Sequence, residues 1–211
     1  MSHHSTRHQL SPLFLNCDGY LYHFFLPEIK SFISEEKLQE IENKLKEQDP
    51  EIFNNFDQNR QEGENNSPLC CLIRNDSIDE FIKYITEGNL LINNTTIKES
   101  IFETNSFLIE RKDISLIEYC AFFGSMKIIQ YLKSNDVKLT PSLWIYAIHS
   151  QNLELIHFLE ENGVEPEDKS YINCITESIK CHHNDMVNYF QEKILNQNSE
   201  EEDQSSVQIF S

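Results

Sequence analysis

The stretch Ser115–Val137, SLIEYCAFFGSMKIIQYLKSNDV, is repeated in pattern by Ser142–Val164, SLWIYAIHSQNLELIHFLEENGV, which begins 27 residues later. The two stretches align without a gap and share identities at Ser115/Ser142, Leu116/Leu143, Tyr119/Tyr146, Ile129/Ile156, Leu132/Leu159, Asn135/Asn162 and Val137/Val164. Self-similarity at a period of about 20 to 50 residues is typical of stacked repeats. A helix pair of this size cannot bury its apolar face alone, so neighbouring pairs must stack on a common core. The pattern therefore predicts a scaffold that presents a surface, and it argues against a pocket built around catalytic groups.

Further helix pairs flank these two repeats. Residues 67–74 and 77–88 predict one pair, and the second of these helices begins with SIDE, which fits a capping box. Residues 168–181 and 184–195 predict another pair with a weaker pattern. We therefore predict an all-α fold with about four helix pairs over residues 67–195, joined by short connectors.

Residues 34–66 are predicted to form a helical cap and a linker ahead of the repeats. Ser34 is a suitable N-cap for a helix whose apolar residues fall three and four positions apart. Pro50 favours the first turn of a second helix, and residues 59–66, NRQEGENN, have the polar composition of a linker.

Three other segments are less regular. Residues 1–33 form an N-terminal arm, in which Asp18-Gly19 between two apolar stretches indicates a hairpin. Residues 89–112 are too long for a plain turn and predict either a functional loop or a short helix with irregular flanks. Residues 196–211 include the acidic run SEEEDQSS and predict a disordered tail.

The charge of the chain excludes several classes of partner. The formal charge is −18, from 35 acidic and 17 basic residues. Nucleic-acid binding requires a basic surface, so we expect no nucleic-acid partner, and the same excess disfavours anionic membranes. A basic protein partner is compatible with this charge.

The lack of a recognisable targeting signal and the spacing of the cysteines lead us to expect a cytoplasmic protein. No uncharged apolar run approaches the roughly 18 residues that cross a bilayer, and the N-terminus lacks a clear signal-peptide pattern. The six cysteines show no paired spacing. We therefore expect an intracellular, reduced environment.

The two repeats resemble ankyrin repeats. The matching residues are the small pair Cys120-Ala121, the turn glycine Gly124, the second-helix residues Ile128, Ile129 and Leu132, and, in the second repeat, Ala147 and Gly163-Val164. Gln151 stands where a turn glycine is usual, and the 27-residue spacing is shorter than the ankyrin repeat of about 33 residues. The resemblance implies an ankyrin-like solenoid with short connectors in place of projecting fingers.

A second resemblance covers roughly residues 25 to 195. Strings such as SPLCCLIRNDSIDEFIKYI and TPSLWIYAIHSQNLELIHFLEENGVEPEDKSY are similar to the degenerate ankyrin domain of unknown function that is expanded in parasitic protists. This resemblance implies an intracellular ankyrin-like protein and carries no known activity. Longer members of that family continue into regular ankyrin repeats.

No motif in the sequence indicates catalysis. GxGxxG, the P-loop, GxSxG and HExxH are absent, so we expect neither an enzyme nor a cofactor. Cys181, His182 and His183, together with Cys174, suggest a zinc- or redox-responsive cluster, but no second ligand pair at zinc spacing is present. The simpler interpretation is a helix end followed by a turn. We therefore assign no metal site and keep a metal- or redox-responsive switch as an alternative function.

The ankyrin resemblance also implies a binding surface. Residues just after the small pair line the concave face of an ankyrin stack, and here that row comprises Phe122, Phe123, His149, Ser150 and Lys180, with Cys181 beside it. If the two phenylalanines are exposed, they form an aromatic patch with a polar rim, which is typical of protein-binding surfaces. The alternative is that residues 89–112 fold over them. We expect a non-catalytic protein–protein interaction module, a scaffold or adaptor, with a truncated structural cap that has lost its binding repeats as a further alternative.

Overall fold

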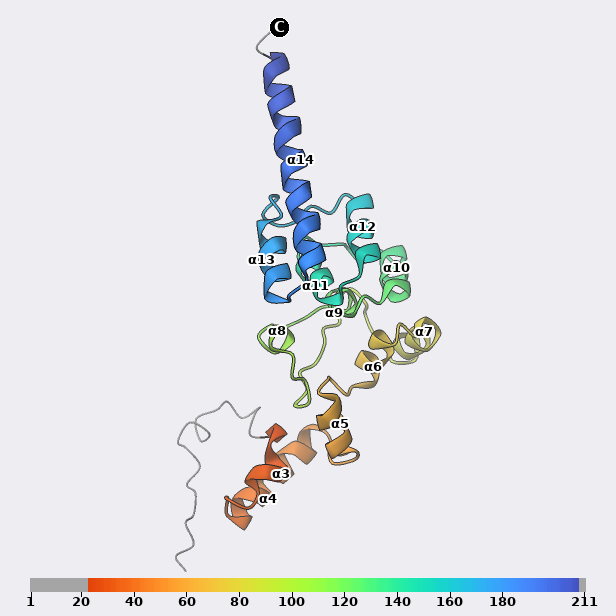
Figure 1. Ribbon diagram of the computed structural model, residues 1–211. Helices are drawn as coiled ribbons and strands as arrows, with labels where there is room; N and C mark the ends of the chain where they lie inside the picture. The colour runs from red at the N-terminus through yellow and green to blue at the C-terminus, as the bar shows by residue number, and fades with distance from the viewer. Residues whose placement is uncertain (1–22, 209–211) are drawn as a thin grey trace, which may run out of the picture. The chain divides into compact units, whose positions relative to one another are not determined.

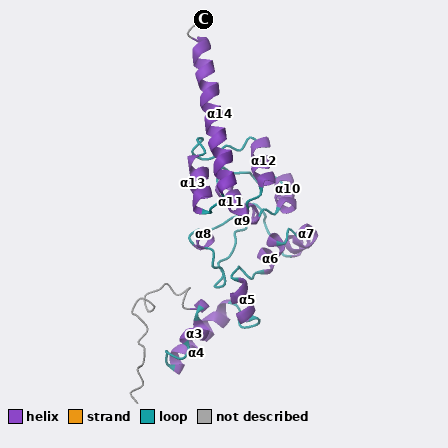
Figure 2. Cartoon of the chain, in the orientation of Figure 1, coloured by secondary structure: helices purple, strands orange, loops and turns teal. Residues whose placement is uncertain are grey.

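The computed structural model describes residues 23–208, with side chains through residue 196, and this part of the chain is helical with no strand (Figures 1 and 2). The predicted all-α class is confirmed. The described residues divide into two compact units, residues 23–66 with 99–111 and residues 67–98 with 112–208. The hairpin predicted at Asp18-Gly19 lies outside the described residues.

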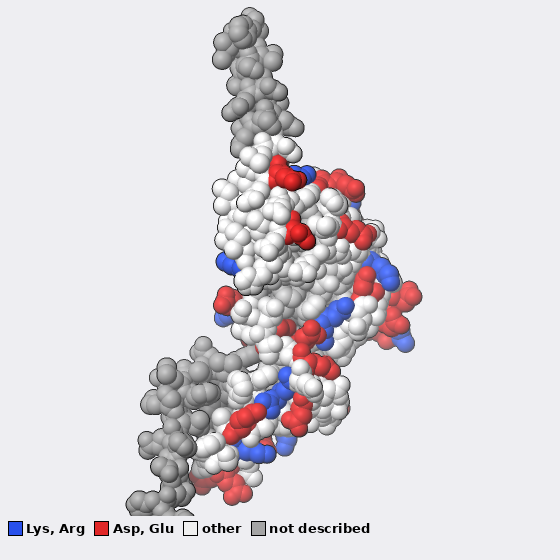
Figure 3. Space-filling model, in the orientation of Figure 1, with Lys and Arg blue, Asp and Glu red and all other residues white. Residues whose placement is uncertain are grey.

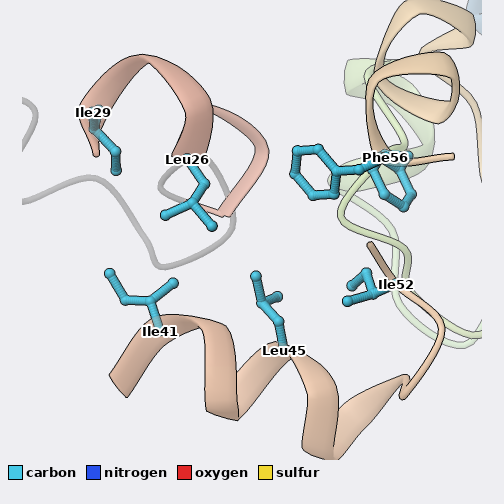
Figure 4. Packing of buried hydrophobic residues seen from close by; sticks show 7 residues of the cluster. Leu26, Ile29, Ile41, Leu45, Ile52 and Phe56 are labelled. Atoms are coloured by element: carbon cyan, nitrogen blue, oxygen red, sulfur yellow. The ribbon is translucent and has the colours of Figure 1, made fainter. Parts of the chain in front are cut away.

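The first unit is built from short helices around one apolar cluster. Its helices are α3 (Leu26–Ile29), α4 (Glu35–Gln48), α5 (Phe56–Glu62) and α8 (Ser106–Ile109). As predicted, Ser34 caps α4 by accepting a hydrogen bond from the Lys37 amide at 3.3 Å. The cluster comprises Leu26, Ile29, Ile41, Leu45, Ile52, Phe56 and Phe102, and Figure 4 shows side chains of α3 and α4 pointing toward one another. Ile41 and Leu45 lie one helical turn apart, so α4 presents a single apolar face to this cluster.

The prediction of a helix starting at Pro50 is wrong. Residues 50–55 form turns, closed by hydrogen bonds such as that from the Asn54 amide to the Glu51 carbonyl at 2.7 Å. Asn55 has a left-handed backbone with φ 59°, which a right-handed helix cannot contain, and α5 starts immediately after it. Because α5 continues to Glu62, half of the predicted linker is helical. The turns allow Ile52 and Phe56 to enter the same cluster, which a continuous helix would not require.

Residues 89–112 contain one short helix, α8, with irregular flanks. This is one of the two alternatives that the sequence predicted for this segment. Its residues 99–111 belong to the first unit, so residues 67–195 do not form one continuous domain. Phe102 is 1% exposed and packs edge-on against Phe56 with ring centroids 5.3 Å apart. Thr104 donates from its amide and from Oγ1 to the Gly63 carbonyl, at 3.0 and 2.7 Å. These contacts are long-range in sequence, and local patterns do not reveal them.

The second unit contains four helix pairs. They are α6 (Pro68–Arg74) with α7 (Ile78–Glu87), α9 (Leu116–Phe123) with α10 (Met126–Ser134), α11 (Leu143–Ser150) with α12 (Leu153–Glu161), and α13 (Ile172–Lys180) with α14 (Asn184–Gln208). The first helices of successive pairs contact one another in series, α6 with α9, α9 with α11, and α11 with α13. Among the second helices, α7 contacts α10.

All four pairs turn in the same way. A residue with a left-handed backbone lies within two positions of the end of each first helix, at Asp76, Gly124, Gln151 and His182, with φ between 47° and 67°. Further left-handed residues follow the second helices at Asn89, Asp136 and Gly163. The next amide donates back to the carbonyl five residues earlier in six of these seven turns, for example from Ser125 to Cys120 at 2.9 Å and from Val137 to Leu132 at 3.0 Å. This is the Schellman arrangement, which ends a helix and satisfies its last carbonyl groups.

One predicted cap differs in the structure. Ser77 makes no side-chain cap to α7, so the capping box predicted at residues 77–80 does not form. A capping box is present instead at the start of α9, where Ser115 and Glu118 each bond the other's backbone. Glu118 also accepts from the Ser142 hydroxyl at 2.7 Å. The two serines that align between the repeats therefore meet at one carboxylate.

The apolar residues shared by the repeats form the core of this unit. Side chains that are fully buried include Ile73, Phe81, Leu116, Ile128, Ile129, Leu132, Leu143, Trp144 and Phe190. Trp144 packs edge-on against Tyr171 and Phe190, with centroids 5.5 and 6.1 Å apart, and its Nε1 donates to the Val164 carbonyl at 2.8 Å. The indole therefore joins its own helix pair to the next one.

The structure differs from the predicted disordered tail over residues 196–208. Helix α14 continues to Gln208. Its first turns are anchored by Met186 and Phe190, which are 3% and 0% exposed. Extending a formed helix by one residue costs far less than nucleating a new one, so a helix anchored in this way continues past its packed part.

Candidate functional site

The predicted surface row crosses three neighbouring helices. Phe122 lies near the end of α9, His149 near the end of α11, and Lys180 at the end of α13. The rings of Phe122 and His149 are stacked, with centroids 5.0 Å apart and planes inclined by 25°. The structure thus brings together side chains that are 27 residues apart, because both helices end at equivalent positions in successive pairs.

The two phenylalanines of this row are not equally accessible. Phe122 is 8% exposed, whereas Phe123 is half-buried. The first alternative considered from the sequence, an exposed pair, is therefore wrong for Phe122. Phe123 lies against the Tyr119 ring at 4.8 Å, and the Arg74 guanidinium lies 5.9 Å from its centroid. A cation at this distance from an aromatic face is attracted to it.

Ser150 and Lys180 have different roles in the row. The Ser150 hydroxyl donates to the Ala147 carbonyl at 2.7 Å and accepts from the Asn152 amide at 3.1 Å, so it helps to shape the turn after α11. Lys180 is exposed, and its Nζ lies 3.0 Å from Glu177 Oε2. Lys180 is thus available at the surface while it orients a neighbouring carboxylate.

A compact cluster of three chemically different side chains lies in the same row. His149 Nε2 is 3.0 Å from Glu177 Oε1, and Cys181 Sγ is 3.5 Å from His149 Nδ1 and 3.8 Å from Nε2. One ligand atom from each residue falls within 4.8 Å of the other two. The His149 and Glu177 side chains are only 13% and 12% exposed, so the cluster is largely shielded from solvent. In the part of the chain that the structure describes, no other group of this kind was found.

Opposing effects act on the two acidic groups of this cluster. Burial tends to raise the pKa of Glu177, but hydrogen bonds from Lys180 and His149 outweigh it, so the pKa lies below its usual value and the carboxylate is favoured. Burial, reinforced by the Glu177 charge, raises the pKa of the Cys181 thiol. The cluster therefore holds a carboxylate beside a thiol that keeps its proton at neutral pH.

The cluster of Cys174, Cys181, His182 and His183 considered from the sequence is not assembled. Cys174 is fully buried in α13, and burial first, then the charge of Asp168, raises its thiol pKa to about 12. His183 Nδ1 lies 2.9 Å from the Ile148 carbonyl and supports the turn, while His182 is exposed on the left-handed residue of that turn. Only Cys181 points toward other ligand-type side chains, because it lies on the face of α13 that packs against α11.

Sequence reasoning missed Glu177. A signal was present, since Glu177 lies four residues before Cys181 and therefore on the same face of a helix. The missing information was which face of α13 meets His149, and this depends on how two helix pairs pack.

The remaining described cysteines are free, and none of those with a shifted pKa is activated. Burial raises the pKa of the Cys70 thiol, and it raises the pKa of Cys120 further, with added repulsion from Asp76. A nucleophilic thiol needs a lowered pKa. These two thiols have the properties of core residues.

A second surface feature is formed by the short connectors. Residues 136–141 and 162–169 line an open groove together with Lys133, which contacts the Asn162 side chain. Its lining combines apolar residues, such as Val137 and Pro141, with charged residues of both signs.

The charge of the described surface is mixed. Figure 3 shows acidic side chains distributed over the visible face, with lysines and arginines interspersed among them. In the part of the chain that the structure describes, no helix combines the length and the apolar character that crossing a bilayer would demand.

Comparison with known protein families, with characterised proteins and with solved structures found no match to this chain.

Proposed function

We propose that the four helix pairs form an ankyrin-like repeat array that acts as a non-catalytic protein–protein interaction module. Two features support the array. The first helices contact one another in series, and all four pairs share a left-handed residue at the same turn. Repeats of this kind build extended surfaces from equivalent positions of successive units, and such surfaces serve recognition.

The observation that carries the proposal is the row from Arg74 and Phe123 through Phe122 and His149 to Lys180. Its members come from α6, α9, α11 and α13, and they join aromatic area to cationic and polar groups. Aromatic residues and arginine dominate the energetics of protein interfaces, with polar groups at the rim. Within this row, Phe123 is the aromatic anchor that a partner can reach, because Phe122 is buried beneath its neighbours.

The overall charge supports a basic partner. At −18, the chain attracts positively charged surfaces over a distance, which raises association rates and makes them sensitive to salt. The row contributes specificity at short range, since its cations repel a uniformly basic surface. A partner of this module is therefore expected to carry a basic region beside an apolar or acidic contact point.

The experiment is an affinity capture of partners from cell lysate at low and high salt, followed by binding measurements with each purified partner. The variants are Phe123→Ala and Lys180→Glu in the row, with Ile172→Ala as a matched control. Ile172 is an apolar side chain of α13 that is 59% exposed and lies outside the row. A partner that the control binds like wild type, and that Phe123→Ala binds about tenfold or more weakly, corresponds to a hot spot of at least about 1.4 kcal/mol.

Two outcomes contradict this function. Capture that disappears at high salt and is equal for all variants indicates nonspecific charge attraction. Binding that depends on no residue of the row favours the alternative of a structural cap without its own binding repeats. Each variant must also melt cooperatively, so that a lost partner reports on the surface and not on unfolding.

A further inference from the structure

We infer that His149, Glu177 and Cys181 form a binding site for a transition-metal ion of the zinc class. The three side chains come from two successive helix pairs, His149 from α11 and the other two from α13 and its C-terminal residue. Figure 1 shows these helices within the same group of four pairs, and α11 and α13 are in contact. This ligand set differs from the one that the sequence suggested, and the inference does not depend on the proposed interaction function.

The ligand atoms of the three side chains lie close enough to be drawn onto one ion, since they fall within 4.8 Å of one another. Bond lengths of about 2.0–2.1 Å to nitrogen or oxygen and about 2.3 Å to sulfur place tetrahedral ligands roughly 3.3 Å (N to O) and 3.6 Å (N to S) apart. His149 Nε2 lies 3.0 Å from Glu177 Oε1 and 3.8 Å from Cys181 Sγ. Cys181 Sγ also lies 3.5 Å from His149 Nδ1, so one ion shared through Nε2 requires the Cys181 side chain to rotate by more than about an ångström, away from Nδ1.

The neighbours of the cluster hold its members in place. The Phe122 ring stacks on His149 and limits rotation of the imidazole, and Lys180 Nζ binds Glu177 Oε2, which leaves Oε1 directed toward His149. Groups that orient the ligands in this way are a regular part of metal sites and affect affinity strongly.

The types of ligand atom in this cluster determine which metal ions it favours. Imidazole nitrogen and thiolate sulfur are suited to zinc, cobalt and related ions, whereas magnesium and calcium prefer oxygen ligands. Three protein ligands leave a fourth position for a water molecule. Cys181 binds as a thiolate, and its proton passes to the solvent, so the ion binds without any change of oxidation state.

A bound ion would connect two helix pairs that otherwise meet through packing. Because the ligands are assembled only in the folded chain, binding stabilises the fold by an amount that grows with the logarithm of the metal concentration above the dissociation constant. The expected signature is a melting temperature that rises as zinc is added above the dissociation constant.

The test uses the full-length chain, freed of metal by a chelator and titrated with zinc chloride and, separately, with cobalt chloride. We expect one ion per chain, cobalt absorption bands of tetrahedral intensity, and a sulfur-to-cobalt charge-transfer band in the near ultraviolet. Removal of an outer-shell partner typically lowers metal affinity 10–100-fold, so loss of a ligand in His149→Gln or Cys181→Ser should lower zinc affinity by about 100-fold or more. Glu177→Gln should weaken binding and preserve the hydrogen-bonding shape of the side chain.

Two variants serve as matched controls. His182→Asn removes the imidazole next to Cys181 and keeps a residue type that tolerates the left-handed backbone, and Cys71→Ser removes a half-buried thiol elsewhere. Both should bind zinc like wild type. The inference is overturned if wild type binds no zinc, if its cobalt spectrum lacks the charge-transfer band, or if His149→Gln and Cys181→Ser bind zinc as tightly as the controls. The cobalt spectrum of wild type decides the matter even if a ligand variant fails to fold.

Discussion

Left-handed residues at the ends of helices determine the course of the chain in the repeats. Glycine adopts this conformation without strain, yet only Gly124 and Gly163 are glycines among the seven turns, and the others are Asp, Asn, Gln or His. Gly88, which the sequence marks as a helix stop, has φ −78°, and its neighbour Asn89 takes the left-handed position. The two left-handed glycines differ in what surrounds them, and this difference can be measured.

Replacement of Gly124 by alanine should destabilise the protein more than the same change at Gly163. Both glycines have φ 67°, so each alanine carries a strain of about 1–2 kcal/mol. At Gly124 the new Cβ would also lie 3.2 Å from Ser150 Cβ and 3.3 Å from Asn152 Cβ, whereas nothing lies within 4 Å at Gly163. Overpacking adds about 1–3 kcal/mol. Denaturant unfolding of both variants checks this, and equal losses would show that the close approach at Gly124 relaxes without cost.

Helix ends in the second unit are stabilised by residues from neighbouring pairs. The N-terminus of α10 has no side-chain cap from its own Ser125, and the Asp76 carboxylate accepts from the Lys127 and Ile128 amides instead, both at 3.0 Å. Asp76 lies in the turn between α6 and α7. A carboxylate at a helix N-terminus is favoured by the helix dipole as well as by hydrogen bonds.

Asp76→Gly should reduce stability by about 1–2 kcal/mol, because it removes the cap and leaves the left-handed backbone unstrained. Asp76→Asn keeps an oxygen acceptor at the same place and should lose roughly half as much. Denaturant unfolding gives the order, and amide hydrogen exchange of Lys127 and Ile128 tests the cause. If their exchange is unchanged in Asp76→Gly, the cap contributes nothing to α10.

A second connection between helices depends on pH. Glu160 of α12 accepts from the Tyr189 hydroxyl at 2.7 Å and pairs with Lys193 at 2.9 Å, both from α14. Burial tends to raise the pKa of Glu160, but hydrogen bonds from Lys193, Tyr189 and His157 outweigh it, so its pKa lies below the usual value of 4.5. A carboxyl group with a lowered pKa in the folded state contributes stability above its unfolded pKa and loses this contribution as the pH falls through the folded value.

Glu160→Gln should therefore reduce stability at neutral pH by about 0.5–1 kcal/mol, a modest amount because solvent partly screens the pair. The difference from wild type should shrink as the pH falls below 4.5 and vanish under more acidic conditions, where wild type is also neutral at this position. Urea unfolding at a series of pH values measures this difference. The exposed neighbour Glu161 provides the control Glu161→Gln, and a Glu160 effect that persists unchanged in acid would exclude the ionic contribution.

Helices of successive pairs contact one another in the second unit, as α9 does with α11 and α11 with α13. Trp144 is the single tryptophan of the chain and is 1% exposed in α11, so its fluorescence reports on one pair of the stack. Leu132 is fully buried in α10 of the preceding pair. In a repeat array, stability is the sum of the intrinsic stability of each unit and of the interfaces between neighbours.

Leu132→Ala should lower the stability of its own pair by about 2–5 kcal/mol through the cavity that it creates. If the pairs are coupled, the unfolding transition seen by Trp144 fluorescence moves to lower denaturant together with the loss of helix seen by circular dichroism. Gln130→Ala, an exposed change in the same helix, should leave both transitions within about 0.5 kcal/mol of wild type. A tryptophan transition that stays in place while helix is lost earlier would mean that the pairs unfold separately.

The helix pairs, their apolar faces and the all-α class could be predicted from the sequence. Helix caps and apolar periodicity are local patterns that can be recognised within about ten consecutive residues. The same local rules did not anticipate the turns after Pro50, which allow Ile52 and Phe56 to enter one apolar cluster, or the continuation of α14 to Gln208. They also could not assign residues 99–111 to the first unit, since Phe102 is held there by residues distant in sequence.

The contacts within the candidate site were even less predictable from the sequence than the fold was. The residue types of the row were visible in the chain, but the burial of Phe122 and the meeting of His149 with Glu177 and Cys181 were not. Which side chains meet across two helices is set by the rotation and register of one helix pair on the next. That register arises from the packing of the whole stack, and no local pattern of residues specifies it.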